Sequence, residues 1–145
     1  MIISNQEEAL ELFHKFDEPI RAYHPKNYDG KANSDKFQLF IKRLQKRTKK
    51  SFSVDTGYSI QDASFHSQIH FNDSQTLLRF SNFGSMVTFF EGDKIDKSLH
   101  SLVLIILSDL EYQYVPEEYI SLEYDGENRS VKGFKDWSHR FFDWV

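Results

Sequence analysis

Hydrophobic residues in the first third of the chain recur at the spacing of two amphipathic helices. Ser4 and Glu7 have the spacing of a capping box, in which two side chains bond the free backbone N–H groups at a helix start. The apolar stripe that follows comprises Ala9, Leu10, Phe13 and Phe16. A second stripe, at positions i, i+3, i+4 and i+7, comprises Phe37, Phe40, Ile41 and Leu44. The pattern predicts a short helix after Ser4 and another that begins at Ser34 or Asp35.

The segment between these helices, residues 17–34, is rich in turn-forming residues. It contains two prolines, the triplet Tyr28-Asp-Gly30 and the pair Asn33-Ser34. We therefore expect one long connection here, and connections of this length are often functional.

After Ser51 the hydrophobic period changes to two, which is the period of a half-buried β-strand. The inward positions are Phe52, Val54, Ala63, Phe65, Ser67, Ile69 and Phe71, and those of the second run alternate with Ser64, His66, Gln68 and His70. Turn-forming residues at 72–74 lead to an extended run at 76–83, and Gly84 and Ser85 separate it from another at 86–90. Successive strands joined by short turns predict an antiparallel meander.

A third helical pattern starts at Asp96 or Ser98. Its apolar positions are Leu99, Leu102, Val103, Ile106, Leu107 and Leu110. Leu104 and Ile105 widen this stripe until it nearly encircles the helix, so we expect a central core helix.

The last part of the chain completes the expected fold. Pro116 ends any continuation of the third helix, and the pattern predicts a short edge strand at 119–124 and a terminal aromatic helix at 134–144. The elements together predict the α+β class, with an antiparallel β-sheet meander packed against three to four helices. Residues 1–145 are expected to form a single globular domain.

Composition fits that expectation and suggests a compartment. A chain of 145 residues suits one domain, which buries roughly two thirds of the surface of the unfolded chain. Fourteen Phe, seven Tyr and two Trp predict a rigid aromatic core. Cysteine is absent, which excludes disulfides and thiolate metal sites and favours a reducing compartment. Because neither a signal-peptide pattern nor an apolar run of about 18 residues is present, we expect a cytoplasmic protein without membrane attachment.

Charge is distributed unevenly along the chain. Seven Lys or Arg and no acidic residue occupy the helical segment 36–50. Such a face is able to bind phosphates, although a solvated surface, or one paired with the acidic half of the same chain, is the plainer interpretation. Between 91 and 127 the balance is reversed, with ten Asp or Glu against Lys94 and Lys97. Several tyrosines are interleaved with these carboxylates, as is favourable at protein interfaces.

Two histidine patterns invite a catalytic or metal-binding interpretation. His66 and His70, with Asp73 nearby, occupy one expected strand, but four residues of strand separate two side chains by about 13 Å, too far to share a metal ion. We therefore expect two polar-face histidines.

The second pattern is Ser138-His139 beside Asp136 and Asp143. It lacks the Gly-x-Ser-x-Gly turn of a hydrolase nucleophile anywhere in the chain. We expect no catalytic residues, no metal and no cofactor.

The end of the chain carries a Tyr-Asp-Gly turn followed by Trp, Arg and a Phe-Asp-Trp close. Its matching residues are Tyr124, Asp125, Gly126, Asn128, Trp137, Arg140, Phe141, Phe142, Asp143 and Trp144. This ending, about a fifth of the chain, resembles that of small bacterial immunity proteins, the antidotes of contact-dependent growth inhibition and polymorphic toxin systems. The resemblance implies structural roles: Gly126 permits the turn, the rings pack in the core, and Arg140 pairs with Asp143 or another nearby carboxylate.

The resemblance also implies a function. A protein of this kind binds a cognate toxin C-terminal domain stoichiometrically and blocks its active site. Nuclease toxins are basic around their clefts, so an acidic, tyrosine-rich surface suits such a partner. The candidate toxin-binding residues are Glu111, Glu117, Glu118, Tyr119, Glu123, Asp125 and Glu127. We expect no small-molecule substrate, and the alternative is a nucleic-acid-associated or regulatory binding protein that uses the basic helix 36–50.

Overall fold

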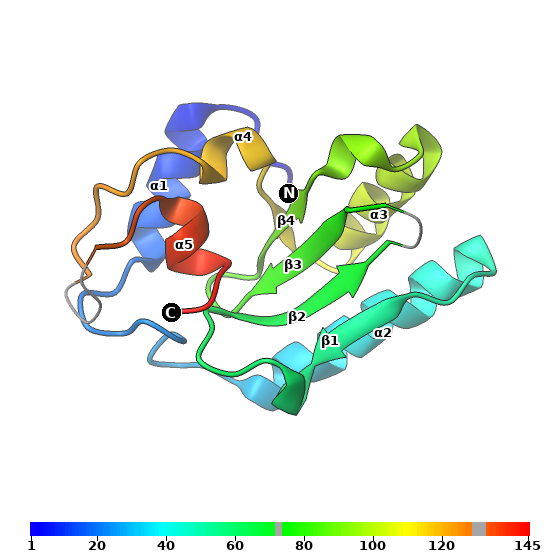
Figure 1. Ribbon diagram of the computed structural model, residues 1–145, viewed down its shortest axis with the longest axis horizontal. Coiled ribbons are helices and arrows are strands. Elements are labelled where there is room, and N and C mark those ends of the chain that lie inside the picture. Colours follow the sequence, from blue (N-terminus) through cyan, green and yellow to red (C-terminus); the bar gives the residue numbers. More distant parts are fainter. Residues whose placement is uncertain (72–73, 129–132) are drawn as a thin grey trace.

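The computed structural model describes residues 1–71, 74–128 and 133–145, in which five strands form one sheet (Figure 1). The strands are β1 (Ser53–Thr56), β2 (Phe65–His70), β3 (Leu77–Ser81), β4 (Met86–Phe90) and β5 (Gln113–Tyr114). They lie in chain order, and β1 to β4 are antiparallel, as the period-two pattern predicts. The α+β class is confirmed, whereas residues 72 and 73 of the expected turn lie outside the described residues.

Two long helices, α2 (Gly30–Thr48) and α3 (Lys97–Asp109), cover one face of this sheet. Ile69 pairs with Leu78 and Leu78 with Phe89, so these three side chains share that face. The predicted stripe of α2 packs against them: Phe37, Phe40, Ile41 and Leu44. α3 buries Val103, Ile106 and Leu107.

α3 is not the central helix that its wide apolar stripe predicts. Its side chain at Ile105 is 53% exposed, because the helix covers the sheet with one face and leaves the other in solvent. No further layer of the described residues covers that outer face.

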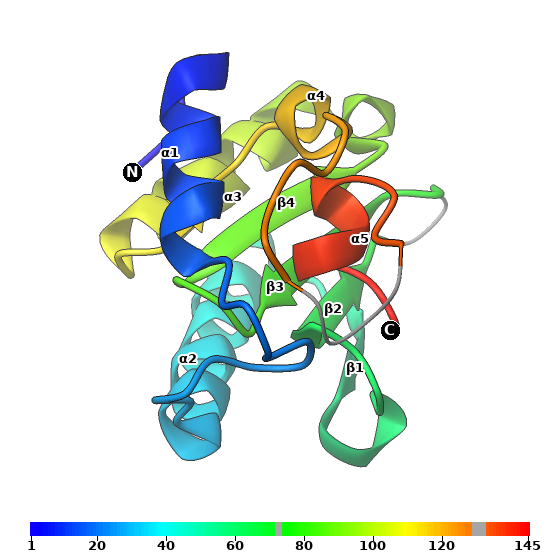
Figure 2. The ribbon, with the colours of Figure 1, turned by 90° about the vertical axis from the view of Figure 1, so that its left-hand side faces the viewer.

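Three shorter helices pack on the opposite face of the sheet, at its β4 end (Figure 2). They are α1 (Gln6–Phe16), α4 (Glu117–Ile120) and α5 (Trp137–Phe141). Met86 and Phe90 point towards them, since side chains alternate along β4 and Val87 and Phe89 point to the other face. The molecule therefore has two separate apolar clusters, one on each side of β4.

The two N-terminal helices begin at other residues than the sequence predicts. Asn5, not Ser4, is the N-cap of α1, and its Oδ1 accepts a hydrogen bond from Glu8 N at 2.9 Å. The Glu8 carboxylate, rather than that of Glu7, bonds back to Ser4 N. α2 begins at Gly30, because the side chain of Asp29 accepts from Ala32 N at 3.0 Å. Ser34 and Asp35 therefore lie inside the helix.

The edge strand predicted at 119–124 is wrong. Residues 117–120 form α4, whose start after Pro116 and two first-turn glutamates suit a helix N-terminus. The fifth strand is β5, which lies parallel to β4 after the crossover through α3. Tyr114 holds it against the N-terminus, donating from N to Met1 O at 2.8 Å and accepting from Ile3 N at 2.9 Å. The terminal helix, α5, is shorter than the predicted 134–144.

Candidate functional site

A buried ion pair ties the end of the chain to the connection after α1. The side chain of Arg140, on α5, is fully buried, and its Nε donates to Asp17 Oδ1 at 2.7 Å. The Asp17 side chain is only 2% exposed. Arg140 also donates from Nη2 to the carbonyl oxygen of Arg21 at 2.8 Å. The expectation of a carboxylate partner for Arg140 is met by Asp17, far away in sequence, and not by Asp143.

The same aspartate positions the Tyr-Asp-Gly turn. Its Oδ2 accepts hydrogen bonds from the Tyr124 hydroxyl at 2.7 Å and from Glu127 N at 2.8 Å. The Tyr124 oxygen in turn accepts from Asn128 N at 2.7 Å. Burial, reinforced by the Asp17 charge, raises the pKa of Tyr124 to about 12, so the phenol remains a donor at neutral pH. Asp17 therefore holds segment 124–128 in place.

Gly126 has a different role from the one the resemblance implies. It is not among the glycines with positive φ, so the turn does not require its conformational freedom. A Cβ at this position would lie 2.0 Å from Asp17 Oδ2 and 2.6 Å from the Tyr124 ring. Glycine is needed because Asp17 and Tyr124 approach the backbone closely.

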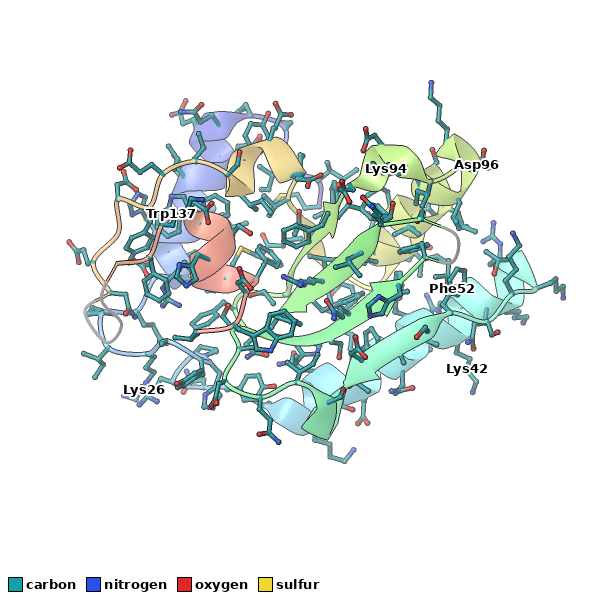
Figure 3. All side chains as sticks on the ribbon, in the orientation of Figure 1. Lys26, Lys42, Phe52, Lys94, Asp96 and Trp137 are labelled. Atoms are coloured by element: carbon teal, nitrogen blue, oxygen red, sulfur yellow. The ribbon has the colours of Figure 1, made fainter. Side chains whose placement is uncertain are left out.

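The aromatic ending is buried except for its last ring. Trp137 is fully buried and packs against Phe13 with ring centroids 5.1 Å apart and against Tyr124 at 4.6 Å (Figure 3). Phe141 and Phe142 are also fully buried, as predicted. Trp144 is 44% exposed, which corrects the expectation that it belongs to the core.

Four of the predicted toxin-binding residues lie on α4 and on the segment that follows it, which face the same side of the molecule as α1 (Figure 2). Glu118, Glu123, Asp125 and Glu127 are exposed, and Asp125 Oδ1 lies 3.2 Å from His14 Nε2 of α1. Glu11 and Glu7 precede His14 by three and seven residues, so they lie on the same stripe of α1, and both are exposed. We call the combined surface the acidic face; it consists of Glu7, Glu11, Glu118, Glu123, Asp125 and Glu127. Among the described residues, only His14 forms an ion pair with it.

The other three predicted residues have different surroundings. The Glu117 carboxylate accepts two hydrogen bonds from Glu91 N, at 3.0 and 3.1 Å, and so fixes the chain before η2 (Gly92–Lys94). The Tyr119 hydroxyl donates to Ser4 O at 3.3 Å, which joins α4 to the start of α1. Glu111 follows α3 on the other side of the sheet, near Lys36 of α2.

The basic surface of α2 lies at the far end of the molecule from the acidic face (Figure 1). Lys42, Arg43, Lys46 and Arg47 are exposed and form no ion pair within the described residues. Figure 3 shows Lys42 directed away from the sheet. The surface is therefore solvated, and it does not pair with the acidic half of the chain.

The two histidines of β2 do not share a face. A register shift between Phe65 and Ser67 turns His66 towards the helix side, where its ring lies 6.4 Å from that of Phe37. Burial lowers the pKa of His66 to about 4, which keeps it neutral. The expectation of a polar-face histidine is thus wrong for His66, and Asp73 lies outside the described residues.

His70 belongs to a polar row on the open face of the sheet. Its Nε2 lies 2.6 Å from Asp55 Oδ2, which also accepts from Gln68 Nε2 at 2.8 Å. These hydrogen bonds lower the pKa of Asp55. Gln68 accepts from Arg79 Nε at 2.8 Å, and Arg79 donates to the carbonyl oxygen of Phe142. Each partner in this row is satisfied, so the row has a structural role.

The Ser138-His139 pair is part of a helix cap. Asp136 is the N-cap of α5, and its Oδ1 accepts from His139 N at 2.7 Å. The carboxylate of Asp143 lies instead 3.8 Å from Arg79. Within the described residues, no three His, Asp or Glu side chains gather as they do in a metal site.

Sequence reasoning missed two parts of this site. The sequence places Asp17 only in a connection. The one feature that pointed to a buried carboxylate was Arg140, which needs a partner of opposite charge. Glu7 and Glu11 were not linked to the acidic segment, because the contact between His14 and Asp125 spans most of the chain.

Comparisons of the chain with protein-family models, with characterised proteins and with solved structures found no match. In the described parts of the chain, no helix combines the length and the apolar character that a membrane crossing requires.

Proposed function

We propose that this protein is an immunity protein, which binds a toxin domain and neutralises it by covering the active site. The observation that carries the proposal is the acidic face: three segments on one side of the molecule carry six exposed carboxylates, and only His14 pairs with them among the described residues (Figure 2). A surface with this excess of one charge favours a partner of the opposite charge.

A nuclease is the toxin class that this charge fits best. Enzymes that cleave nucleic acid bind phosphates with Lys and Arg, and carboxylates are able to occupy the same positions. Long-range attraction would speed the encounter, and the half-buried Tyr119, next to Glu118 in the chain, adds apolar contact area with a polar end. The mechanism is stoichiometric occlusion and involves no bond-making step.

The compartment follows from the same proposal. A toxin that cleaves nucleic acid acts inside the cell, so its inhibitor has to bind it there. A chain without cysteine is suited to the reducing cytoplasm. We therefore place the protein there.

The direct test is capture of the partner followed by protection of cells. Tagged protein is used to isolate its binding partner from the native cell, and the partner is then expressed with or without the protein in a sensitive host. We expect the wild type to restore growth and the variant Glu118→Lys/Glu123→Lys/Glu127→Lys to restore it poorly. Glu111→Lys is the matched control, since Glu111 lies on the other side of the sheet. Equal protection by all three proteins would exclude the acidic face.

A second candidate function rests on the unpaired cations of α2. A helix surface with several exposed Lys and Arg is able to bind nucleic acid through phosphates. In that case the wild type would retard RNA or DNA at low salt, and neutralising Lys42, Arg43, Lys46 and Arg47 would abolish the retardation. Under the immunity proposal the same neutralisation leaves protection intact.

A further inference from the structure

A polar cavity of about 370 Å³ lies away from the acidic face and from the cations of α2. Its walls come from the connection after α1, the first turns of α2, η1 (Gly57–Ser59), and residues that flank and begin β2. The start of α2 and η1 overlap at the bottom of Figure 1 but stand apart in Figure 2, and residues of both line the cavity. Its volume is at the lower end of the range of small-molecule sites, which is roughly 300–1,000 Å³. It therefore suits a small ligand or a single side chain.

Aromatic rings form much of the wall. Tyr23, His24 and Tyr28 come from the connection, and Phe65 comes from β2. His24 and Tyr28 are stacked, with ring centroids 4.6 Å apart and planes at 13°. Burial raises the pKa of Tyr28, so its ring is a neutral phenol at physiological pH. Faces of neutral aromatic rings attract organic cations.

The polar groups of the wall are mostly acceptors. Asp62 contributes a carboxylate, and the hydroxyls of Ser34 and Thr56 are close by. Asn82 is only 8% exposed, and its Oδ1 has no hydrogen-bond donor among the described residues. Its Nδ2 donates to Tyr23 O at 2.7 Å, which fixes the orientation of the amide. The Oδ1 atom itself is closed off from solvent, so the acceptors that a ligand meets in the cavity are the Asp62 carboxylate and the hydroxyls.

The charges around the cavity discriminate between possible ligands. Among the described residues that line it, none is Lys or Arg, and Asp62 is the one carboxylate. His66 adds no positive charge at neutral pH, since burial lowers its pKa to about 4. An anion at the start of α2 would meet Asp29, which already caps that helix. A cation meets acceptors and ring faces instead.

We propose that this cavity binds one organic cation, a guanidinium or alkylammonium group, between the rings of Tyr23 and Tyr28 and the carboxylate of Asp62. The cation comes either from a free small molecule or from a Lys or Arg side chain of a protein partner. The proposal does not depend on the acidic face or on the immunity function.

The test uses an isosteric pair of probes that differ in charge, butylguanidinium and butylurea. Each is titrated into isotopically labelled protein, and the amide resonances of Asp62, Asn82 and Tyr28 are followed by NMR. We expect saturable shifts with butylguanidinium and about ten-fold weaker binding of butylurea, which corresponds to the loss of one cation–π and carboxylate contact. Equal affinity of the two probes, or no saturable shift with butylguanidinium, would overturn the proposal.

Two pairs of variants locate the site. Asp62→Asn keeps the backbone, because Asn tolerates the positive φ of 54° at this position as Asp does, and it should weaken binding up to about five-fold. Asp35→Asn, at an exposed carboxylate of α2 outside the cavity, should leave affinity unchanged. Tyr28→Leu should weaken binding and Tyr28→Phe should not, since only the ring face is required. Equal effects within either pair would contradict the assignment.

A third arm distinguishes the two sources of the cation. A short blocked peptide with one central arginine is compared with butylguanidinium. Tighter binding of the peptide indicates a side chain of a protein partner, whereas exclusion of the peptide indicates a free small molecule.

Discussion

Asp17 accepts three hydrogen bonds from residues more than 100 positions away, although the sequence marks its segment only as a connection. It binds Arg140 with Oδ1, and it accepts from Tyr124 and the backbone of Glu127 with Oδ2. Removing one member of a buried ion pair leaves the other charged, desolvated and without a partner. This pair should therefore cost more to break than a pair on the surface.

We expect Asp17→Asn and Arg140→Met each to lower the free energy of unfolding by about 3–5 kcal/mol, as measured by urea denaturation. The matched control is Lys31→Met, which breaks an exposed ion pair with Asp35 and should change stability little, because solvent screens such a pair. Similar losses for the buried and the exposed pair would show that Asp17 does not organise the ending.

Gly126 should be intolerant of a side chain for a steric reason. Gly126→Ala places a Cβ 2.0 Å from Asp17 Oδ2, so the carboxylate or the turn has to move. We expect a loss of about 1–3 kcal/mol, the usual cost of overpacking. Gly57→Ala is the comparison, since a Cβ there meets no atom within 4 Å and only its φ of 60° is unfavourable. Thermal melting that ranks Gly57→Ala as the worse variant would contradict this role.

His66 should make the protein less stable in weak acid. Its pKa is about 4 when folded and about 6.5 when unfolded, so between these values the unfolded chain binds more protons. The free energy of unfolding should fall as pH drops through this window, by up to about 1.4 kcal/mol per pH unit. It is fully recovered above the unfolded value.

The measurement for His66 is the urea midpoint at several pH values for the wild type and for His66→Gln. Burial also lowers the pKa of His100, so the difference between the two proteins isolates His66. Parallel curves would show that His66 is not held neutral in the folded protein.

At the scale of secondary-structure elements, the sequence prediction and the structure differ at the start of α2. The pattern places the cap at Ser34 or Asp35, whereas the Asp29 side chain caps the helix. We expect Asp29→Ala to lower the free energy of unfolding by about 1 kcal/mol and Ser34→Ala to have little effect. Circular dichroism during thermal unfolding compares the two, and the reverse order would support a start at the later residue.

Local periodicity predicted the elements that bury side chains at a fixed spacing along the chain. The meander and the stripe of α2 are examples. β5 and α4 were not predicted, since β5 is held by Met1 and Ile3 and α4 by contacts with β4 and α5. The change of face at His66 depends on a register shift that no period reveals.

At the scale of the whole molecule, the charge asymmetry along the sequence becomes a separation in space. The acidic face and the cations of α2 lie at opposite ends (Figure 1). Sequence alone predicted four members of the acidic face, because they are close together in the chain. It missed Glu7 and Glu11, which join them only through the contact of His14 with Asp125. It also missed the cavity, whose walls come from segments far apart in the chain.

The most direct test of the acidic face is the association rate constant with the purified toxin domain, measured by stopped-flow at increasing salt. For the wild type we expect fast association that slows steeply with salt. At low salt, Glu118→Lys/Glu123→Lys/Glu127→Lys should associate about ten-fold more slowly or worse, because the attraction becomes repulsion. Glu111→Lys and the variant neutralised at Lys42, Arg43, Lys46 and Arg47 should stay within about two-fold of the wild type. Unchanged association of the triple variant, or loss of binding in the α2 variant, would contradict an acidic-face inhibitor.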